Sequence, residues 1–187
     1  MKLIGANDVR GKRNPRYRWL ANIIKERGYT SGAEVGVDLG TTTEYLFKNC
    51  PNLFLYAVDL WQRQTQIKKV NGKWINHPDP EFALKTFTER TLPYHNRMVM
   101  LQGISWEVTR SVMDYTLDFV FIDADHKYES VKKDILAWTP KLKIGGMISG
   151  HDINMPGVLQ AVSELIPNFK IVGIDKCWEA KREDVWL

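Results

Sequence analysis

The feature that most constrains the fold is the segment Leu117–Asp123, LDFVFID, an almost continuous apolar run that ends in an acidic residue. Runs of this kind are typical of strands that are buried on both faces inside a parallel sheet. Parallel strands must be joined by crossover connections, which are usually helices. The chain is therefore expected to form an α/β domain with helices on both faces of its sheet.

Strand and helix patterns alternate along the rest of the chain, as such a domain requires. Helices are predicted over Pro15–Gly28, Thr42–Lys48, Asp79–Leu92, Tyr128–Thr139 and Gly157–Ile166. Strands are predicted over Ala33–Gly36, Leu53–Asp59, Arg97–Leu101, Leu117–Asp123 and Met147–Ser149, with a final antiparallel pair over Phe169–Ile174 and Cys177–Lys181. The predicted fold is a single doubly wound, Rossmann-like sheet of about seven mostly parallel strands, with an antiparallel C-terminal strand.

One stretch interrupts this alternation. Residues 61–78 are too many for a simple connection, and they contain Asn71-Gly72, the strongest short hairpin signal. We expect a hairpin or lid over the carboxyl edge of the sheet, because long ordered insertions in compact domains are often binding loops. No linker-like segment divides the sequence, which predicts one domain over residues 1–187.

Composition narrows the classes of partner. The sequence has no apolar run long enough for a signal peptide or a membrane span, so we expect a cytoplasmic protein without membrane contact. Cys50 and Cys177 have no metal-binding spacing and are expected to be small buried hydrophobes. Basic residues gather near the N-terminus and over Arg63–Lys73, within a net charge of +4. A solvated basic face is favoured over a nucleic-acid surface.

The turn EVGVDLG, at Glu34–Gly40, is the first candidate ligand site, because open α/β sheets bind ligands at the carboxyl ends of their strands. Gly36 and Gly40 would let a ligand approach the backbone. Their G-x-x-x-G spacing differs from the G-x-G-x-x-G of dinucleotide sites. Glu34 and Asp38 add negative charge where a diphosphate would lie. The turn therefore favours a cationic sulfonium cofactor over a nicotinamide dinucleotide.

Two further strand ends would hold an adenosine. Asp59 ends the predicted strand Leu53–Asp59, where a carboxylate can accept hydrogen bonds from both ribose hydroxyls. Ser105 follows the next strand and could reach the adenine edge. Trp106 could cover the adenine face or belong to the core.

An acidic and histidine-rich cluster follows the two remaining strands. Asp123 is suited to meet the cofactor's amino group or a metal ion, while Asp125 could cap the following helix. Asp152 is expected to face Asp123 across adjacent strand ends, as a carboxylate pair that could hold Mg²⁺. His151 or His126 could act as a general base. The sequence leaves the base and metal routes open.

With these residues identified, the chain resembles the class I S-adenosylmethionine-dependent methyltransferases, and in particular the small-molecule O-methyltransferase branch with a D-x-D-H-x-Y motif. The matching segments are Glu34–Gly40, Asp59, Ile122–Ile135 (IDADHKYESVKKDI) and Gly145–Asp152 (GGMISGHD). The resemblance implies that Glu34, Gly36 and Asp59 hold the cofactor. It also implies that Asp123 and Asp152 lie near the reacting methyl group.

Two departures from this family pattern bear on the site. Metal-dependent relatives often have an asparagine directly after the second aspartate, whereas Ile153 separates Asp152 from Asn154 here. The family-like G-D-S after the third strand is G-I-S in this chain, at Gly103–Ser105. The first departure weakens the prediction of a metal, and the second removes one polar contact to the adenine end.

The expected function is S-adenosylmethionine-dependent O-methylation of a small hydroxylated substrate, with a sugar-like or anionic acceptor suggested by the basic segment Arg63–Lys73. RNA ribose methylation, a non-catalytic cofactor-binding scaffold subunit and a nicotinamide dehydrogenase are the alternatives. Base-amino methyltransferases carry an Asp/Asn-Pro-Pro-aromatic motif, which Asp-Ala-Asp-His replaces here. The acidic and histidine cluster argues against a mere scaffold. A homodimer is a further option, in which some of the seven tryptophans would be covered.

Overall fold

The computed structural model describes residues 16–62, 68–70, 73–75, 79–172 and 175–186. Its main sheet has seven strands in the order β5-β2-β1-β6-β7-β9-β8. These are β1 (Ser31–Val35), β2 (Phe54–Asp59), β5 (Met98–Gln102), β6 (Leu117–Ile122), β7 (Leu142–Gly150), β8 (Lys170–Val172) and β9 (Cys177–Lys181). Neighbours from β5 to β7 are parallel, while β9 runs antiparallel to both β7 and β8. The predicted doubly wound sheet with an antiparallel C-terminal strand is confirmed.

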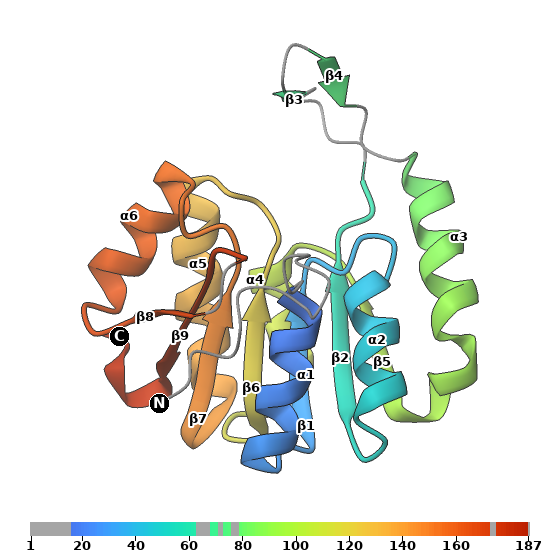
Figure 1. The fold of residues 1–187 in the computed structure, drawn as a ribbon, viewed down its shortest axis with the longest axis horizontal. Helices are drawn as coiled ribbons and strands as arrows, with labels where there is room; N and C mark the ends of the chain where they lie inside the picture. Colours follow the sequence, from blue (N-terminus) through green and yellow to red (C-terminus); the bar gives the residue numbers. More distant parts are fainter. Residues whose placement is uncertain (1–15, 63–67, 71–72, 76–78, 173–174, 187) are drawn as a thin grey trace, which may run out of the picture.

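Helices cover both faces of this sheet (Figure 1). One layer holds α1 (Arg16–Arg27), α2 (Thr41–Asn49) and α3 (Pro80–Thr91), and the other holds α4 (Ser105–Val108), α5 (Tyr128–Trp138) and α6 (Pro156–Leu165). Short 3-10 segments are η1 (Leu92–Arg97), η2 (Thr109–Ser111), η3 (Thr139–Lys141) and η4 (Arg182–Asp184).

Strand β6 lies at the centre of the sheet, and its side chains explain why its sequence is apolar almost throughout. Phe119 and Phe121 point into the core beneath α1 and α2, whereas Val120 and Ile122 point into the core beneath α5 and α6. Successive residues of a strand face opposite sides, so a strand with a helical layer on each side buries them all. The carboxyl end of β6 is thereby fixed at the middle of the sheet edge.

Local signals define the helix that follows the insertion. Asp79 caps α3, since its Oδ1 accepts a hydrogen bond from the amide of Glu81 at 3.0 Å, and Pro80 occupies the first turn. The observed helix differs by one residue at each end from the prediction.

Two elements differ more clearly from the prediction. Strand β7 begins at Leu142, five residues before the predicted start at Met147. Gly145, with φ of 76°, and Gly146 lie within it, although glycine has a weak preference for strands. Helix α4 has only four residues and no helical pattern that a sequence could reveal.

The insertion between β2 and α3 contains a second, two-stranded sheet. Its strands β3 (Lys68–Val70) and β4 (Lys73–Ile75) pair antiparallel, with Val70 opposite Lys73. The pair stands off beyond the end of β2 in Figure 1. The turn residues Asn71 and Gly72 lie outside the described residues. The role of this hairpin as a lid stays a prediction.

Both cysteine predictions are confirmed, because Cys50 and Cys177 are buried free thiols. Within the described part of the chain, no helix combines the length and apolar character needed to cross a membrane.

Candidate functional site

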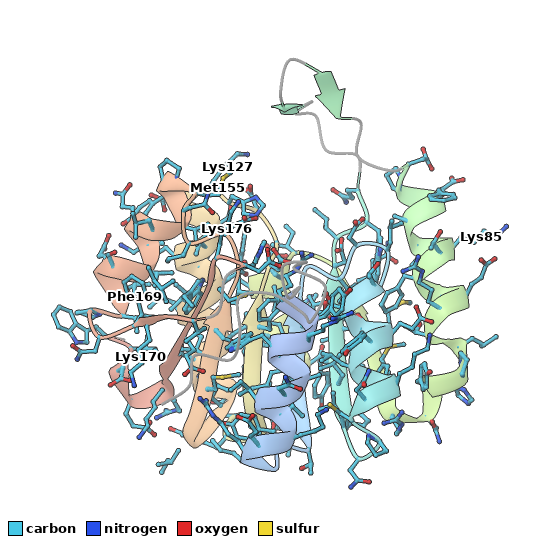
Figure 2. The ribbon with its side chains drawn as sticks, in the orientation of Figure 1. Lys85, Lys127, Met155, Phe169, Lys170 and Lys176 are labelled. Atoms are coloured by element: carbon cyan, nitrogen blue, oxygen red, sulfur yellow. The ribbon has the colours of Figure 1, made fainter. Side chains whose placement is uncertain are left out.

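The candidate site lies where β1, β2, β6 and β7 end, because these parallel strands finish at the same edge of the sheet. Asp59 is the last residue of β2, and the loops after the other three strands contribute Gly36, Asp123 and His151. Lys127 and Lys176 are labelled at this end of the molecule in Figure 2. The strand ends at which ligand-binding residues were predicted, including that of β5, therefore lie along one edge of the sheet.

Gly36 lies where the loops after β1 and β6 touch. It has φ of 94°, and a Cβ at this position would come within 2.2 Å of the carbonyl oxygen of Asp123. Its amide also donates a hydrogen bond to the carbonyl oxygen of Val58 at 2.8 Å. We predicted that Gly36 admits a ligand to the backbone, and the described contact is with the Asp123 loop itself. At Gly36, the turn Glu34–Gly40 is therefore in direct contact with the loop that carries Asp123 of the acidic cluster.

Asp59 is held in one orientation by two backbone amides. Its Oδ2 accepts from the amide of Asp38 at 2.8 Å, and its Oδ1 accepts from the amide of Trp61 at 2.9 Å. The indole of Trp61 donates in turn to the carbonyl oxygen of Asp38 at 3.1 Å. Asp38 and Trp61 both adopt positive φ, 47° and 40°. Each carboxylate oxygen can accept a second hydrogen bond, so Asp59 can still bind hydroxyl groups.

Glu34 lies beneath this turn rather than on its surface. Its side chain is 2% exposed and accepts a hydrogen bond from the hydroxyl of Thr43 at 2.6 Å. Burial raises the pKa of Glu34 to about 8, although the Thr43 hydrogen bond acts in the opposite direction. Glu34 is therefore mostly protonated at neutral pH. Through Thr43 it connects the end of β1 to the start of α2 beneath the turn.

Replacing Glu34 with glutamine should flatten the pH dependence of stability. A buried carboxyl with a raised pKa stabilises the fold fully below its unfolded value near 4.5, and this contribution is lost as pH rises through about 8. Glutamine keeps the acceptor for Thr43 but never ionises. The Glu34→Gln variant should gain roughly 3–5 kcal/mol relative to the wild type between pH 4.5 and pH 8. Urea unfolding at both pH values would measure it, and equal pH profiles would contradict it.

The acidic and histidine residues form one connected cluster at the ends of β6 and β7. Asp152 Oδ2 lies 3.0 Å from His126 Nε2 and 3.2 Å from His151 Nδ1. His151 Nδ1 is also 3.5 Å from Asp123 Oδ1, and His151 Nε2 is 3.8 Å from Asp175 Oδ1. His151 thus lies among three carboxylates from three different segments. The predicted proximity of Asp123 and Asp152 is present in the structure.

This environment sets the charges of the cluster. Burial opposes the charged form of His151, but hydrogen bonds to Asp123 and Asp152 outweigh it and raise its pKa to about 9. Hydrogen bonds from His126 and His151 hold the pKa of Asp152 well below its usual range, against the effect of its burial. His151 is therefore an imidazolium at neutral pH. In this arrangement the single positive charge of the ring offsets part of the negative charge of the three surrounding carboxylates.

Two residues of the cluster were not predicted from the sequence. Arg16, at the start of α1, places its Nε 2.8 Å from Asp123 Oδ2, and its amide donates to Asp175 Oδ2 at 2.9 Å. We had assigned Arg16 to a solvated basic face, and no local motif marks it as a site residue. Asp175 lies in the predicted turn before β9. Only the fold brings them to the site.

Three side chains of the cluster could hold a metal ion. Asp123, His126 and Asp152 each offer one ligand atom, and these atoms lie within 4.8 Å of one another. The same carboxylates already contact Arg16 and His151, so a cation would have to share or displace these partners.

The remaining predicted residues lie at the edges of this site. Ser105 begins α4, and its hydroxyl donates to the carboxyl of the buried Asp134. Trp106 packs its ring over Lys133 Nζ at 4.9 Å. Asp125 accepts hydrogen bonds from the Ser130 hydroxyl at 2.8 Å and from the Lys127 amide at 3.4 Å, which ties it to the start of α5. Gly40, with φ of 75°, is the N-cap of α2.

Comparison with known proteins gives this site a context. A family model described as a methyltransferase domain matches residues 33–153. No curated protein matches the chain.

Solved structures share its fold at low sequence identity. The O-methyltransferase TomG from Streptomyces achromogenes, solved with S-adenosylmethionine, is 13% identical with a TM-score of 0.62, over 89% of this chain and 79% of TomG. The cofactor-bound protein Rv0187 from MTB is 14% identical with a TM-score of 0.63, over 89% and 78%. A TDP-rhamnose 3'-O-methyltransferase of calicheamicin biosynthesis is 13% identical with a TM-score of 0.59, over 89% and 80%.

Proposed function

This chain belongs to the methyltransferase domain family, and we propose that it transfers a methyl group from S-adenosylmethionine to a hydroxyl oxygen of a small molecule. The observation that carries the proposal is the contact between the Gly36 turn and the loop of Asp123. This contact joins a turn suited to a sulfonium cofactor to a cluster of carboxylates and imidazoles. The family match spans both parts of the site.

The cofactor would be held by the ends of β1, β2 and β6. Asp59 has the remaining acceptor capacity for the two ribose hydroxyls, and two backbone amides keep it in position. Asp123 supplies a carboxylate for the amino group of the methionine part. In this binding mode the amino group takes the place of the Arg16 guanidinium at Asp123 Oδ2, while His151 stays beside Asp123 Oδ1.

The transfer itself is an in-line displacement. The acceptor oxygen forms a bond to the methyl carbon as the carbon–sulfur bond breaks, and the bonding electrons pass to the sulfur, which becomes neutral. The hydroxyl proton must leave to a base. His126 is the better candidate, because its imidazole is bonded to Asp152 and is more exposed than that of His151, whose raised pKa keeps it protonated. Alignment and exclusion of water supply the rest of the rate enhancement.

A divalent cation is the alternative means of activating the hydroxyl. Asp123, His126 and Asp152 are close enough together to hold one. A bound cation would lower the pKa of the acceptor hydroxyl. The imidazole suits Mn²⁺ better than Mg²⁺, which prefers oxygen ligands throughout. Turnover after chelation, measured with Mg²⁺ and Mn²⁺ restored separately, distinguishes this route from catalysis by His126 alone.

The acceptor we favour is a hydroxylated, sugar-like molecule that carries an anionic group. The basic residues of the insertion support an anionic acceptor. The structurally similar TDP-rhamnose 3'-O-methyltransferase acts on a sugar nucleotide. A screen of nucleotide-linked sugars, with release of S-adenosylhomocysteine as the readout, tests this preference. RNA ribose methylation would instead appear as methyl incorporation into RNA.

The cofactor proposal is tested by calorimetric titration with S-adenosylhomocysteine, using NAD as the control ligand. We expect micromolar affinity for the first and none for the second. Asp59→Ala should weaken S-adenosylhomocysteine binding at least tenfold, because two hydrogen bonds to a charged group are lost. His151→Ala should reduce turnover while cofactor affinity is retained.

Asp114→Ala is the matched control for the Asp59 variant. Asp114 is a surface carboxylate paired with Lys141, remote from the strand ends that form the site, and its loss should leave affinity unchanged. Absence of S-adenosylhomocysteine binding by folded wild-type protein would contradict the proposed function, whereas binding without methyl transfer to any acceptor would favour the cofactor-binding scaffold.

A further inference from the structure

Asp134 is a buried carboxyl group that the proposed reaction does not use. It lies on α5 and is 1% exposed, and its Oδ1 accepts a short hydrogen bond from the Ser105 hydroxyl. Its Oδ2 is buried and has no hydrogen-bond partner among the described residues. Burial raises the pKa of Asp134 to about 7, against the effect of the Ser105 hydrogen bond. An apolar residue would fill this helix position at lower cost in desolvation.

Ser105 is the last residue of the turn Gly103–Ser105 and the first residue of α4, a helix that gives this turn little support. Helix α4 has only four residues, and its N-cap, Ile104, makes no side-chain capping bond. Next to Ser105, Trp106 packs over Lys133, the neighbour of Asp134. Ser105 and Trp106, the first two residues of α4, thus contact two consecutive residues of α5. The turn is attached to a helix that begins directly after the D-x-D-H motif.

The other end of the same turn is attached to the candidate ribose site. The amide of Gly103 donates to the carbonyl oxygen of Asp59 at 3.0 Å. Gly103 has φ of 155°, and a Cβ there would lie 2.7 Å from a methyl group of Val108. The turn Gly103–Ser105 is therefore hydrogen-bonded to Asp59 at its first residue and to Asp134 at its last.

We propose that Asp134 is a positioning residue for the cofactor: through Ser105 it fixes the Gly103–Ser105 turn against α5, so that the adenosine end of the pocket keeps one conformation. This inference rests on the proposed binding of S-adenosylmethionine. It changes the part played by Ser105, which we predicted as a direct cofactor contact. The hydroxyl of Ser105 faces α5, and the turn as a whole borders the cofactor.

The test compares Ser105→Ala, Asp134→Ala and Asp134→Asn in the full chain. Ser105→Ala and Asp134→Ala should each weaken binding of S-adenosylhomocysteine about tenfold, and binding of 5'-methylthioadenosine by a similar factor, because both ligands carry the adenosine. The KM for S-adenosylmethionine should rise in parallel, while kcat at saturating cofactor stays within about twofold, since the acidic cluster is untouched. Asp134→Asn should restore most of the affinity, because its amide oxygen can accept from Ser105 and the group is neutral.

Thr139→Ala is the matched control. The hydroxyl of Thr139 is buried near the end of α5 and donates to the carbonyl oxygen of Ile135 at 2.6 Å. Its loss removes a hydrogen bond from the same helix but leaves the contact between Asp134 and the Gly103–Ser105 turn in place. This variant should keep wild-type affinity. Unchanged affinity in Ser105→Ala would overturn the proposal, as would a fall in kcat with KM unchanged. If the wild type fails to bind S-adenosylhomocysteine at all, the proposed function fails first, and the two failures are thereby distinguished.

Discussion

Replacing Gly36 with alanine is expected to weaken binding of S-adenosylhomocysteine at least a hundredfold. A Cβ at this position would come within 2.2 Å of the carbonyl oxygen of Asp123, which is backbone and cannot rotate aside. The positive φ of 94° adds strain for any residue with a side chain. The two loops must therefore separate, and both the cofactor turn and Asp123 lose their positions. Calorimetry of the folded variant measures the loss.

Gly28→Ala separates this clash from backbone strain alone. Gly28 also has a positive φ, 66°, but a Cβ there would meet nothing within 4 Å. This control should lose about 1–2 kcal/mol of stability and keep its affinity. Wild-type affinity in Gly36→Ala would show that the contact between the two loops is not needed for cofactor binding.

The Asp152→Asn variant is expected to reduce kcat at least a hundredfold with little change in affinity for S-adenosylhomocysteine. Asparagine tolerates the left-handed backbone of Asp152, with φ of 53°, so the loop should keep its course. The variant removes the charge that orients His126 and His151 and that could hold a metal ion. Groups that manage a proton in the transition state typically contribute ~10²–10⁴-fold to the rate.

Asp125→Asn is the control for this second variant. Asp125 belongs to the D-x-D-H motif that also holds Asp123 and His126, but it contacts Ser130 and Lys127 and lies outside the cluster around His151. The kcat of the Asp125→Asn variant should stay within a few fold of the wild-type value. Equal kcat values in the Asp152 and Asp125 variants would exclude a special role for Asp152.

The sequence was sufficient for the fold because its strongest signals are local. The apolar run of β6, the capping pair Asp79-Pro80 and the spacing of strands and helices each depend on neighbouring residues. Strand β7 was predicted too short because Gly145 and Gly146 have weak strand preference, whereas pairing with β6 and β9 decides its length.

The sequence predicted the residues of the candidate site that lie at strand ends, but not those that reach the site through tertiary contacts. The predicted residues lie at the end of a strand, in the loop that follows it, or in the D-x-D-H motif: Gly36, Asp59, Asp123, His126, His151 and Asp152. Arg16 and Asp175 contact the acidic cluster from α1 and from the turn before β9, and Asp134 contacts Ser105 from the middle of α5. Nothing in their sequence neighbours indicates these contacts. The buried state of Glu34 also depends on packing, since the adjacent glycine turn suggested an accessible residue.

The hydrogen bond from the Arg16 amide to Asp175 joins residues 159 positions apart. During synthesis, the chain must extend beyond β8 before this bond can form, so the acidic cluster can be completed only after most of the polypeptide has been made. Opening of the turn before β9 would withdraw Asp175 from both Arg16 and His151. Protection of the full-length chain from proteolysis by S-adenosylhomocysteine would therefore report whether the start of α1 and the turn before β9 are docked at once.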